Sequence, residues 1–270
     1  MRFVLLILSL HVAVVATAQK HDYVWVFGDS CGLNFNTPDG EPVFFDSGLQ
    51  SNETAGSFCD SSGKLLVAFN GSAETLSSAG NFRNVPLQYF ANADGSAIEY
   101  DFPYPVVKQQ YSGSLHPPVY VNDTIDFSDS QGIFFLPHTT SPDTVYALFF
   151  EFSWPQQVDA AGSFYRFFTI ARPPGGAFRV LPSRLIGREN AEYQTKLAVV
   201  KHADGESWWI ALREWGNKMY EFVRFQDGKI LERVTQKGYY NSGPPQGGTT
   251  GKVSFNRSGT ALLCQLGGGG

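Results

Sequence analysis

The chain has 270 residues, of which 43% are hydrophobic, 15% aromatic and 17% charged, and it carries 28 Gly and 15 Pro. The charged fraction is below the roughly 25% of an average globular protein, which excludes coiled coils and argues against helical bundles. The apolar content excludes disorder, and a formal net charge of −5 gives no electrostatic footprint for nucleic acid. Many aromatic residues together with many glycines predict an all-β fold of strands and turns.

The amino terminus has the pattern of a secretory signal peptide. Arg2 precedes an apolar run from Phe3 to Val15, and Ala16-Thr17-Ala18 then supplies the small-x-small pattern of a cleavage site. We predict a signal peptide of residues 1–18 and a secreted or cell-surface product. A single-pass anchor is the alternative, but the run is shorter than the roughly 20 apolar residues of a spanning helix. No later segment is apolar enough, so we predict no membrane span.

Three cysteines remain after the leader. In an oxidising compartment, an odd count implies one disulfide and a spare thiol, or three free thiols. Cys31 and Cys59 lie near the starts of neighbouring strand segments and form the plausible pair, whereas Cys264 lies in an apolar strand. The alternative is that all three are buried as small hydrophobic side chains. No Cys or His spacing fits a metal site, so we predict no metal and no cofactor.

Short apolar runs separated by turn signals continue along the chain. The predicted strands cover residues 23–27, 56–59, 65–69, 133–136, 145–150 and 164–170, with a hairpin turn at 60–63 and a further turn at 92–95. Residues 72–130 are polar and contain proline, and their organisation is the hardest to predict.

The clearest unit comes late in the chain. Strands at 196–200, 208–212, 219–225 and 230–231 alternate with polar turns, which predicts a four-stranded antiparallel meander of the size of one propeller blade. A further hairpin follows at 253–255 and 261–264. Three hairpins share a polar turn that ends in glycine, at Gly63, Gly205 and Gly259, which indicates a degenerate repeat.

These residues resemble a known family. The segments WVFGDSCGLNF, ETAGSFCDSSGKLLVAFNG, QGIFFLPHTTSPDTVYALFF and KLAVVKHADGESWWIALREWGNKMYEFVRFQDG are similar to the amino-terminal β-propeller of large secreted Bacteroidetes proteins. Such proteins often carry a gliding-motility-associated or type IX secretion domain at the carboxy terminus. The resemblance implies a WD40-like propeller of four-stranded blades at the cell surface, and it carries no catalytic residues.

The family members are expected to continue through further blades. The domain prediction is therefore an incomplete β-propeller over residues 19–266 followed by a glycine tail over residues 267–270. The alternative is a divergent small domain. A partial ring would leave its end faces exposed, because a propeller protects its sheet edges by radial closure.

One string in the sequence suggests catalysis. Gly28-Asp29-Ser30 lies close to the mature amino terminus, where GDS-type serine hydrolases place their nucleophile. Such an enzyme needs a histidine base oriented by a carboxylate, and its Asp-x-x-His motif is missing from this chain. A secreted esterase using Ser30, or a glycan-active enzyme using two carboxylates, is the alternative function.

Binding residues are indicated by aromatic side chains and sequons. Trp208 and Trp209 are adjacent in a strand, so they should point to opposite faces of a sheet. Tyr239 and Tyr240, in a Gly-Asn-Ser-Pro context, are the better candidates for ligand contact. Sequons at Asn52, Asn70, Asn122 and Asn256 would carry glycans only in a eukaryotic source. The leading hypothesis is an exported, non-catalytic binding or scaffold module with a protein or carbohydrate ligand.

Overall fold

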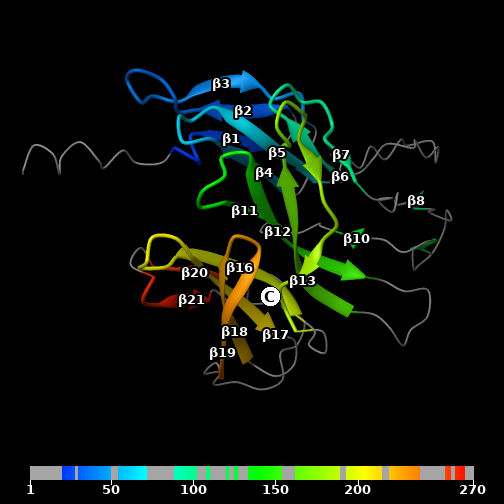
Figure 1. The fold of residues 1–270 in the computed structure, drawn as a ribbon, viewed down its shortest axis with the longest axis vertical. Helices are drawn as coiled ribbons and strands as arrows, with labels where there is room; N and C mark the ends of the chain where they lie inside the picture. The colour runs from blue at the N-terminus through cyan, green and yellow to red at the C-terminus, as the bar shows by residue number, and fades with distance from the viewer. Residues whose placement is uncertain are drawn as a thin grey trace, which may run out of the picture.

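The fold is given by a computed structural model (Figure 1). It describes residues 20–27, 30–49, 54–71, 88–101, 108–109, 120–121, 125–126, 133–153, 162–188, 193–214, 219–237, 253–256 and 259–264. Every regular element in these ranges is a β-strand, which confirms the all-β prediction. The predicted leader, residues 1–18, and the glycine tail lie outside the described residues.

The first two sheets each have three antiparallel strands. Sheet I has the order β1 (Val24–Phe27), β2 (Cys31–Asn34) and β3 (Val43–Asp46). Sheet II has the order β4 (Thr54–Cys59), β5 (Leu65–Gly71) and β6 (Gln88–Asn92). The hairpin expected over residues 56–69 is therefore confirmed.

Sheet III is built on three longer strands. They are β11 (Ile133–Pro137), β12 (Thr144–Ser153) and β13 (Gly162–Ala171), all antiparallel to one another where they pair. Short strands extend this sheet: β7 (Glu99–Tyr100), β10 (Ile125–Asp126), β14 (Arg179–Val180) and β15 (Arg184–Leu185). The pairing of β7 with β14 is parallel. Separately, β8 (Lys108–Gln109) pairs with β9 (Tyr120–Val121).

Sheet IV is the predicted meander. Its strands are β16 (Tyr193–Lys201), β17 (Trp208–Glu214), β18 (Met219–Gln226) and β19 (Lys229–Lys237), hydrogen-bonded in that order. Sheet V consists of β20 (Val253–Phe255) and β21 (Leu262–Cys264). Four-stranded blades throughout were expected, but sheets I and II have three strands each, and no closed ring is seen in the described part of the chain.

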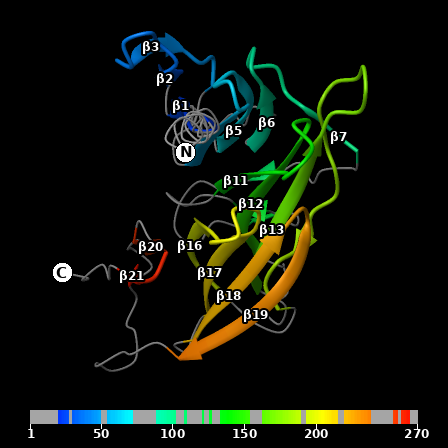
Figure 2. The same ribbon diagram turned by 60° about the vertical axis from the view of Figure 1, so that its left-hand side comes forward.

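The sheets stack face to face in the order of the chain (Figure 2). Strand β12 explains how, because successive side chains of a strand point to opposite faces. Ala147 and Phe149 pack toward sheet II, whereas Leu148 and Phe150 pack toward sheet IV. A cluster of core side chains fills the space between each pair of neighbouring sheets. Between sheets I and II it contains Val26, Leu49, Ala68 and Ala91, and between sheets II and III it contains Val67, Phe69, Phe90, Phe149, Phe168 and Ile170. Between sheets III and IV it contains Leu148, Phe167, Leu212 and Phe225, and between sheets IV and V it contains Ala198, Ala211, Phe222, Phe255 and Leu262.

The two adjacent tryptophans of β17 follow the same alternation. Trp208 packs against the core between sheets III and IV, with the Lys201 ammonium 5.5 Å from its ring centroid. Trp209 lies instead with its ring centroid 6.0 Å from that of His202. The different surroundings agree with the expected opposite orientations.

One glycine turn recurs through the stack. Gly63, Gly95, Gly205 and Gly259 have φ angles of 92°, 81°, 75° and 69°, a region that favours glycine. In each turn the glycine N–H donates to the carbonyl oxygen three residues earlier, at 2.9 or 3.0 Å; the acceptors are Asp60, Asn92, His202 and Asn256. The three turn glycines expected from the sequence are thus confirmed, and Gly95 joins them.

The turns that follow the first strands of sheets II to V lie on the left of Figure 1, and we call them, together with the β18–β19 turn that contacts them, the turn end. It comprises residues 60–64, 138–143, 202–207, 227–228, 256 and 259–261. Neighbouring turns touch: Thr139 N–H donates to Asp227 Oδ1 at 2.8 Å. A Cβ added to Gly259 would lie 3.2 Å from the Val200 side chain. Loops from several sheets therefore converge on one side of the stack.

Candidate functional site

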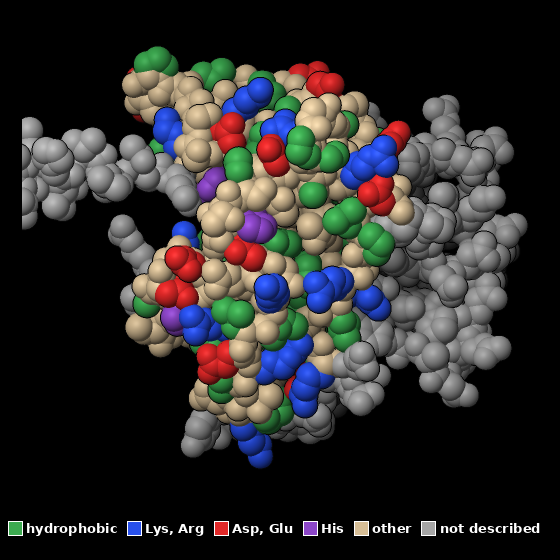
Figure 3. All heavy atoms as spheres, viewed as in Figure 1, with side chains coloured by type: hydrophobic (Ala, Val, Ile, Leu, Met, Phe, Trp, Pro, Cys, Tyr) green, Lys and Arg blue, Asp and Glu red, His purple; other side chains and the backbone are tan. Residues whose placement is uncertain are grey.

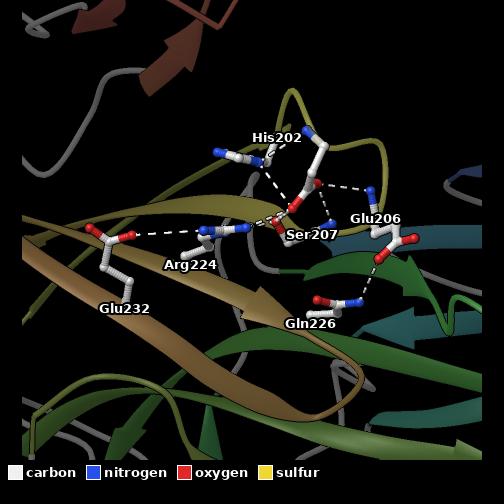
Figure 4. Close-up of polar contacts among 7 residues, drawn as sticks. His202, Glu206, Ser207, Arg224, Gln226 and Glu232 are labelled. Atoms are coloured by element: carbon white, nitrogen blue, oxygen red, sulfur yellow. Dashed lines mark hydrogen bonds and ion pairs between the residues drawn. The ribbon is translucent and has the colours of Figure 1, made fainter.

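The largest polar cluster at the turn end surrounds Asp204, in the turn between β16 and β17 (Figure 4). Its Oδ1 accepts hydrogen bonds from the backbone N–H groups of Glu206 and Ser207, both at 2.9 Å. Its Oδ2 accepts from Ser207 Oγ and from Arg224 Nη2, both at 2.7 Å. His202 Nδ1 lies 3.1 Å from the same oxygen. The carboxylate is thus fully engaged in holding the turn together.

The hydrogen bonds around Asp204 fix its charge. The backbone N–H groups of Ser207 and Glu206 hold the pKa of its carboxyl well below the usual range, with further help from the Ser207 hydroxyl and Arg224. Ser207 is buried, and its Oγ donates to Asp204 and accepts from Arg224 Nε at 3.0 Å. A nucleophilic serine would have to donate to a base such as histidine. The cluster therefore stabilises a turn and has no catalytic geometry.

Changing Asp204 to asparagine should alter the acid side of the stability profile. A carboxyl with a lowered pKa in the folded state stabilises the protein above its unfolded pKa of about 3.9, and this contribution is lost as the pH falls. The melting temperature of Asp204→Asn should be lower than that of the wild type at pH 7, and the gap should shrink below pH 4. Thermal denaturation across this range measures it. The matched control is Glu232→Gln in the same sheet, and a gap that persists unchanged in acid would contradict the assignment.

A second polar cluster is buried at the edge of the core between sheets III and IV. Glu221 of β18 is 0% exposed, and it accepts a hydrogen bond from the Tyr193 hydroxyl and another from Arg233 of β19. Arg188 Nε lies 3.6 Å from Glu221 Oε2, and its Nη2 pairs with Glu214 of β17, which is 4% exposed. We call these five residues the glutamate cluster.

The charges of the glutamate cluster balance. Two carboxylates face two guanidinium groups, and Tyr193 also accepts the Arg188 backbone N–H at 2.7 Å. Burial, and then the hydrogen bond to Glu221, raise the pKa of Tyr193 to about 12, so the phenol stays neutral. Glycoside hydrolysis needs one carboxyl group to exchange a proton with the substrate and a second to attack or activate water. Here both carboxylates are engaged by arginine, which makes the cluster a stabilising element.

Sequence reasoning missed the glutamate cluster, although a signal was present. In β18, Glu221 shares one face with Val223 and Phe225, so the period of two already placed an acid among core residues. The partners Arg188 and Tyr193 come from another part of the chain, and only the tertiary structure brings them to Glu221.

The outer face of sheet I is apolar and exposed, and we call it the end face. Its large apolar side chains are Trp25, Phe27, Leu33 and Phe44, with exposed fractions of 49% for Trp25, 40% for Phe27 and 75% for Phe44, and Cys31 and Asp46 lie on the same face. Hydrophobic side chains are visible at the surface over β3 in Figure 3. Sheets II to IV have neighbouring sheets packed on both faces, whereas this face of sheet I is uncovered, so it is a candidate interaction surface.

Ser30, the candidate hydrolase nucleophile, lies in the turn between β1 and β2. Its φ of 58° is the left-handed conformation used by the last residue of a three-residue hairpin loop. Its backbone bonds to Leu49 and Ser47. Among the residues described, the ring of His21 bonds to Cys59 instead, and His138 and His202 lie beside Asp227 and Asp204. The structure thus gives Ser30 no histidine base within its described part.

The predicted disulfide between Cys31 and Cys59 is not formed in this structure, where both residues are free thiols. Cys31 is paired with Phe27 at one end of β1, whereas Cys59 N–H donates to His21 O beyond the other end. From Phe27 to the start of β1 at Val24, three residues of strand already span about 10 Å, and a disulfide needs Cα atoms within about 7 Å. For Cys264, the structure gives its place in β21 but no side-chain surroundings.

The two thiols should react very differently with iodoacetamide. Burial raises the pKa of Cys59 to about 11, so its thiol stays protonated and shielded at neutral pH, whereas Cys31 is exposed. We expect alkylation of Cys31 in the native protein and of Cys59 only after unfolding, measured by peptide mass spectrometry without reductant. Protection of both residues, relieved only by reductant, would instead show that they are bridged.

The remaining candidate residues are the two predicted ligand-contact tyrosines and the four sequon asparagines. Tyr239, Tyr240, Asn52 and Asn122 fall outside the described residues. Asn70 is 2% exposed within β5, so its side chain has no room for a glycan in this folded structure. Asn256 is exposed, but its side chain holds its own turn through Thr260 and Ala261.

Within the described ranges, no group of three His, Cys, Asp or Glu side chains is arranged to hold a metal ion. The same residues contain no helix with the length and apolar character needed to cross a bilayer. No family model, curated protein or solved structure matches the chain.

Proposed function

We propose that the chain is an exported, non-catalytic binding or scaffold module, built as an arc of β-propeller blades in a secreted or cell-surface protein. The observation that carries this proposal is the convergence of the turns. Sheets I to V pack in chain order, and the turns of sheets II to V gather along one side of the stack. A rigid scaffold that presents several loops on one side is suited to recognition.

The contacts of the turn end support a preformed surface. The Thr139 hydroxyl donates to Asp227 Oδ2 at 2.6 Å, which joins sheet III to sheet IV, and the Asp204 cluster locks the next turn. Exposed side chains such as Thr140 and Glu206 lie between these anchors. Because the loops are already ordered by hydrogen bonds, little conformational entropy would be lost when a ligand binds. The ligand class is a protein or a carbohydrate.

The alternative hydrolase has less support. The structure gives Ser30 no histidine base in its described part, and Glu214 and Glu221 are engaged by arginine side chains. Export remains part of the proposal because residues 1–18 have the composition of a signal peptide.

Two measurements on the mature chain test the proposed function. Glycan and protein arrays should reveal at least one bound ligand, and substitution of Thr140 and Glu206 at the turn end should weaken binding. The control Glu232→Gln, on β19 away from the turns, should bind as the wild type does. A fluorophosphonate probe should leave Ser30 unlabelled; labelling that disappears in Ser30→Ala would establish a hydrolase and refute the proposal. Binding to neither array would refute it as well.

A further inference from the structure

We propose that the end face and the free edge of β3 together bind an extended, basic segment of a partner protein, which adds to sheet I as a fourth strand. This surface is separate from the turn end, and the inference does not depend on the propeller arc. It rests on three features of sheet I: the composition of its outer face, the orientation of the backbone at its edge, and the charge around it.

The outer face offers a continuous apolar surface. Trp25, Leu33 and Phe44 are paired across the three strands and form one row. In the next row, Phe27 lies opposite Cys31 on the same face. The indole Nε1 of Trp25 donates to Asp22 O at 2.7 Å, so its polar atom is already satisfied and the exposed ring is purely apolar. A partner must therefore present apolar side chains to this face.

The edge of β3 offers backbone groups. Ser47 N–H donates to Ser30 O at 2.7 Å, and hydrogen-bonded pairs alternate along antiparallel strands, so residues 43 and 45 bond toward β2. The N–H and C=O groups of Phe44 and Asp46 consequently face away from the sheet. None of the described strands pairs with this edge. Exposed edges of this kind recruit extended segments by β-augmentation.

The edge of β19 is an exposed strand edge in the same molecule that is protected against strand addition. It also exposes apolar side chains, Leu231 and Val234, at 48% and 43%. However, β19 carries Lys229, Arg233 and Lys237, charges of the kind that discourage strand addition. Apart from Pro42 just before it, β3 has no such basic or proline residue.

The charge around β3 selects the partner. Asp46 lies on the end face itself, Glu41 lies two residues before β3, and Asp22 lies two residues before β1; all three are exposed. The nearby Lys20 is engaged by Asn36 Oδ1 at 3.1 Å and lies over the Tyr23 ring. A second copy of this chain would bring acids against acids, whereas a strand that alternates basic and apolar residues matches both the charge and the face.

The test uses labelled synthetic peptides and the mature chain. A peptide of alternating lysine and valine should bind in a saturable way, measured by fluorescence anisotropy, and a peptide of alternating glutamate and valine should bind at least about tenfold more weakly. Added salt should weaken the first interaction. Phe44→Thr should lower the affinity for the lysine peptide about tenfold, because the variant lacks the exposed phenyl ring whose apolar surface the peptide buries on binding.

Edge pairing is tested separately from the apolar face. Phe44→Pro removes an outward N–H without breaking a bond to β2, so it should abolish peptide binding at an unchanged melting temperature. The double variant Glu41→Gln/Asp46→Asn removes two acids near β3, so it should reduce the difference in affinity between the lysine and glutamate peptides. This variant tests the charge argument even where Phe44→Pro does not fold. The control Leu231→Thr on β19 should bind normally.

Three outcomes would overturn the inference. The first is that neither peptide binds, and the second is that both peptides bind with equal affinity to the wild type. The third is a concentration-dependent dimer, seen by analytical ultracentrifugation, that Phe44→Thr abolishes. In that case the end face is occupied by a second copy and not by a basic strand.

Discussion

The variant Glu221→Gln is expected to lose about 3 kcal/mol of folding free energy. Glu221 is 0% exposed and receives hydrogen bonds from Tyr193 and Arg233, with Arg188 close by. Replacing the carboxylate by a neutral amide leaves Arg233 without its charged partner, whereas Arg188 keeps Glu214. The loss should be near the lower end of the range for broken buried ion pairs, because Arg188 and Arg233 are partly exposed and can regain water.

Thermal denaturation measures this loss. For a chain of this size, about 3 kcal/mol corresponds to a fall in melting temperature of about 6–12 °C. The matched control is Glu232→Gln, because Glu232 is 49% exposed and lies 4.0 Å from Arg224, a surface pair worth less than about 1 kcal/mol. The double variant Glu221→Gln/Arg233→Gln should recover part of the loss. Equal melting temperatures for Glu221→Gln and the wild type would show that the carboxylate is not buried against these arginines.

The variant Phe168→Ala should cost about 3–5 kcal/mol, the usual range for a truncated core phenylalanine. Phe168 of β13 is 1% exposed and packs between sheets II and III. Its ring stacks on Phe149 with centroids 4.6 Å apart, and it meets the edges of Phe90 and Tyr100 at 5.6 and 6.3 Å. Removing the ring would leave a cavity that two sheets share.

Urea denaturation checks the prediction for Phe168. The matched control is Phe44→Ala, which removes the same atoms from a side chain that is 75% exposed, and it should change the unfolding free energy by less than about 0.5 kcal/mol. Equal losses for the two variants would contradict the packing of sheet II on sheet III.

The local features of this fold could be predicted from sequence. The hairpin at residues 56–69 and the meander of sheet IV were predictable because alternating apolar residues and Asp- or Asn-containing glycine turns are encoded within a few residues. Gly63, Gly205 and Gly259 could be identified as turn glycines for the same reason. The strands that sequence reasoning missed, such as β7 and β14, are two residues long and pair in parallel across about 80 residues of chain. Nothing local marks such a pairing.

The candidate sites likewise depend on contacts between distant parts of the chain. A bridge between Cys31 and Cys59 looked plausible because the two residues begin neighbouring segments, but strand register places Cys31 beside the last residue of β1, whereas Cys59 N–H bonds to His21, before the first. The glutamate cluster depends on Tyr193 of β16 and on Arg188, which precedes that strand, reaching β18, and no spacing rule in the sequence predicts this contact. Strand number was overestimated because three-stranded and four-stranded sheets have the same periodicity.

The chain-ordered stack also bears on how the molecule opens. Sheets II, III and IV have a core cluster packed against each of their two faces, whereas sheets I and V have a core cluster on one face only. In such a one-dimensional array, stability is the sum of neighbour contacts, so the ends fray before the middle. Amide protons should therefore exchange with solvent fastest in β1–β3 and β20–β21 and slowest in β12, β13 and β17. The same gradient means that a partner strand bound on sheet I would slow the exchange of the end that otherwise opens first.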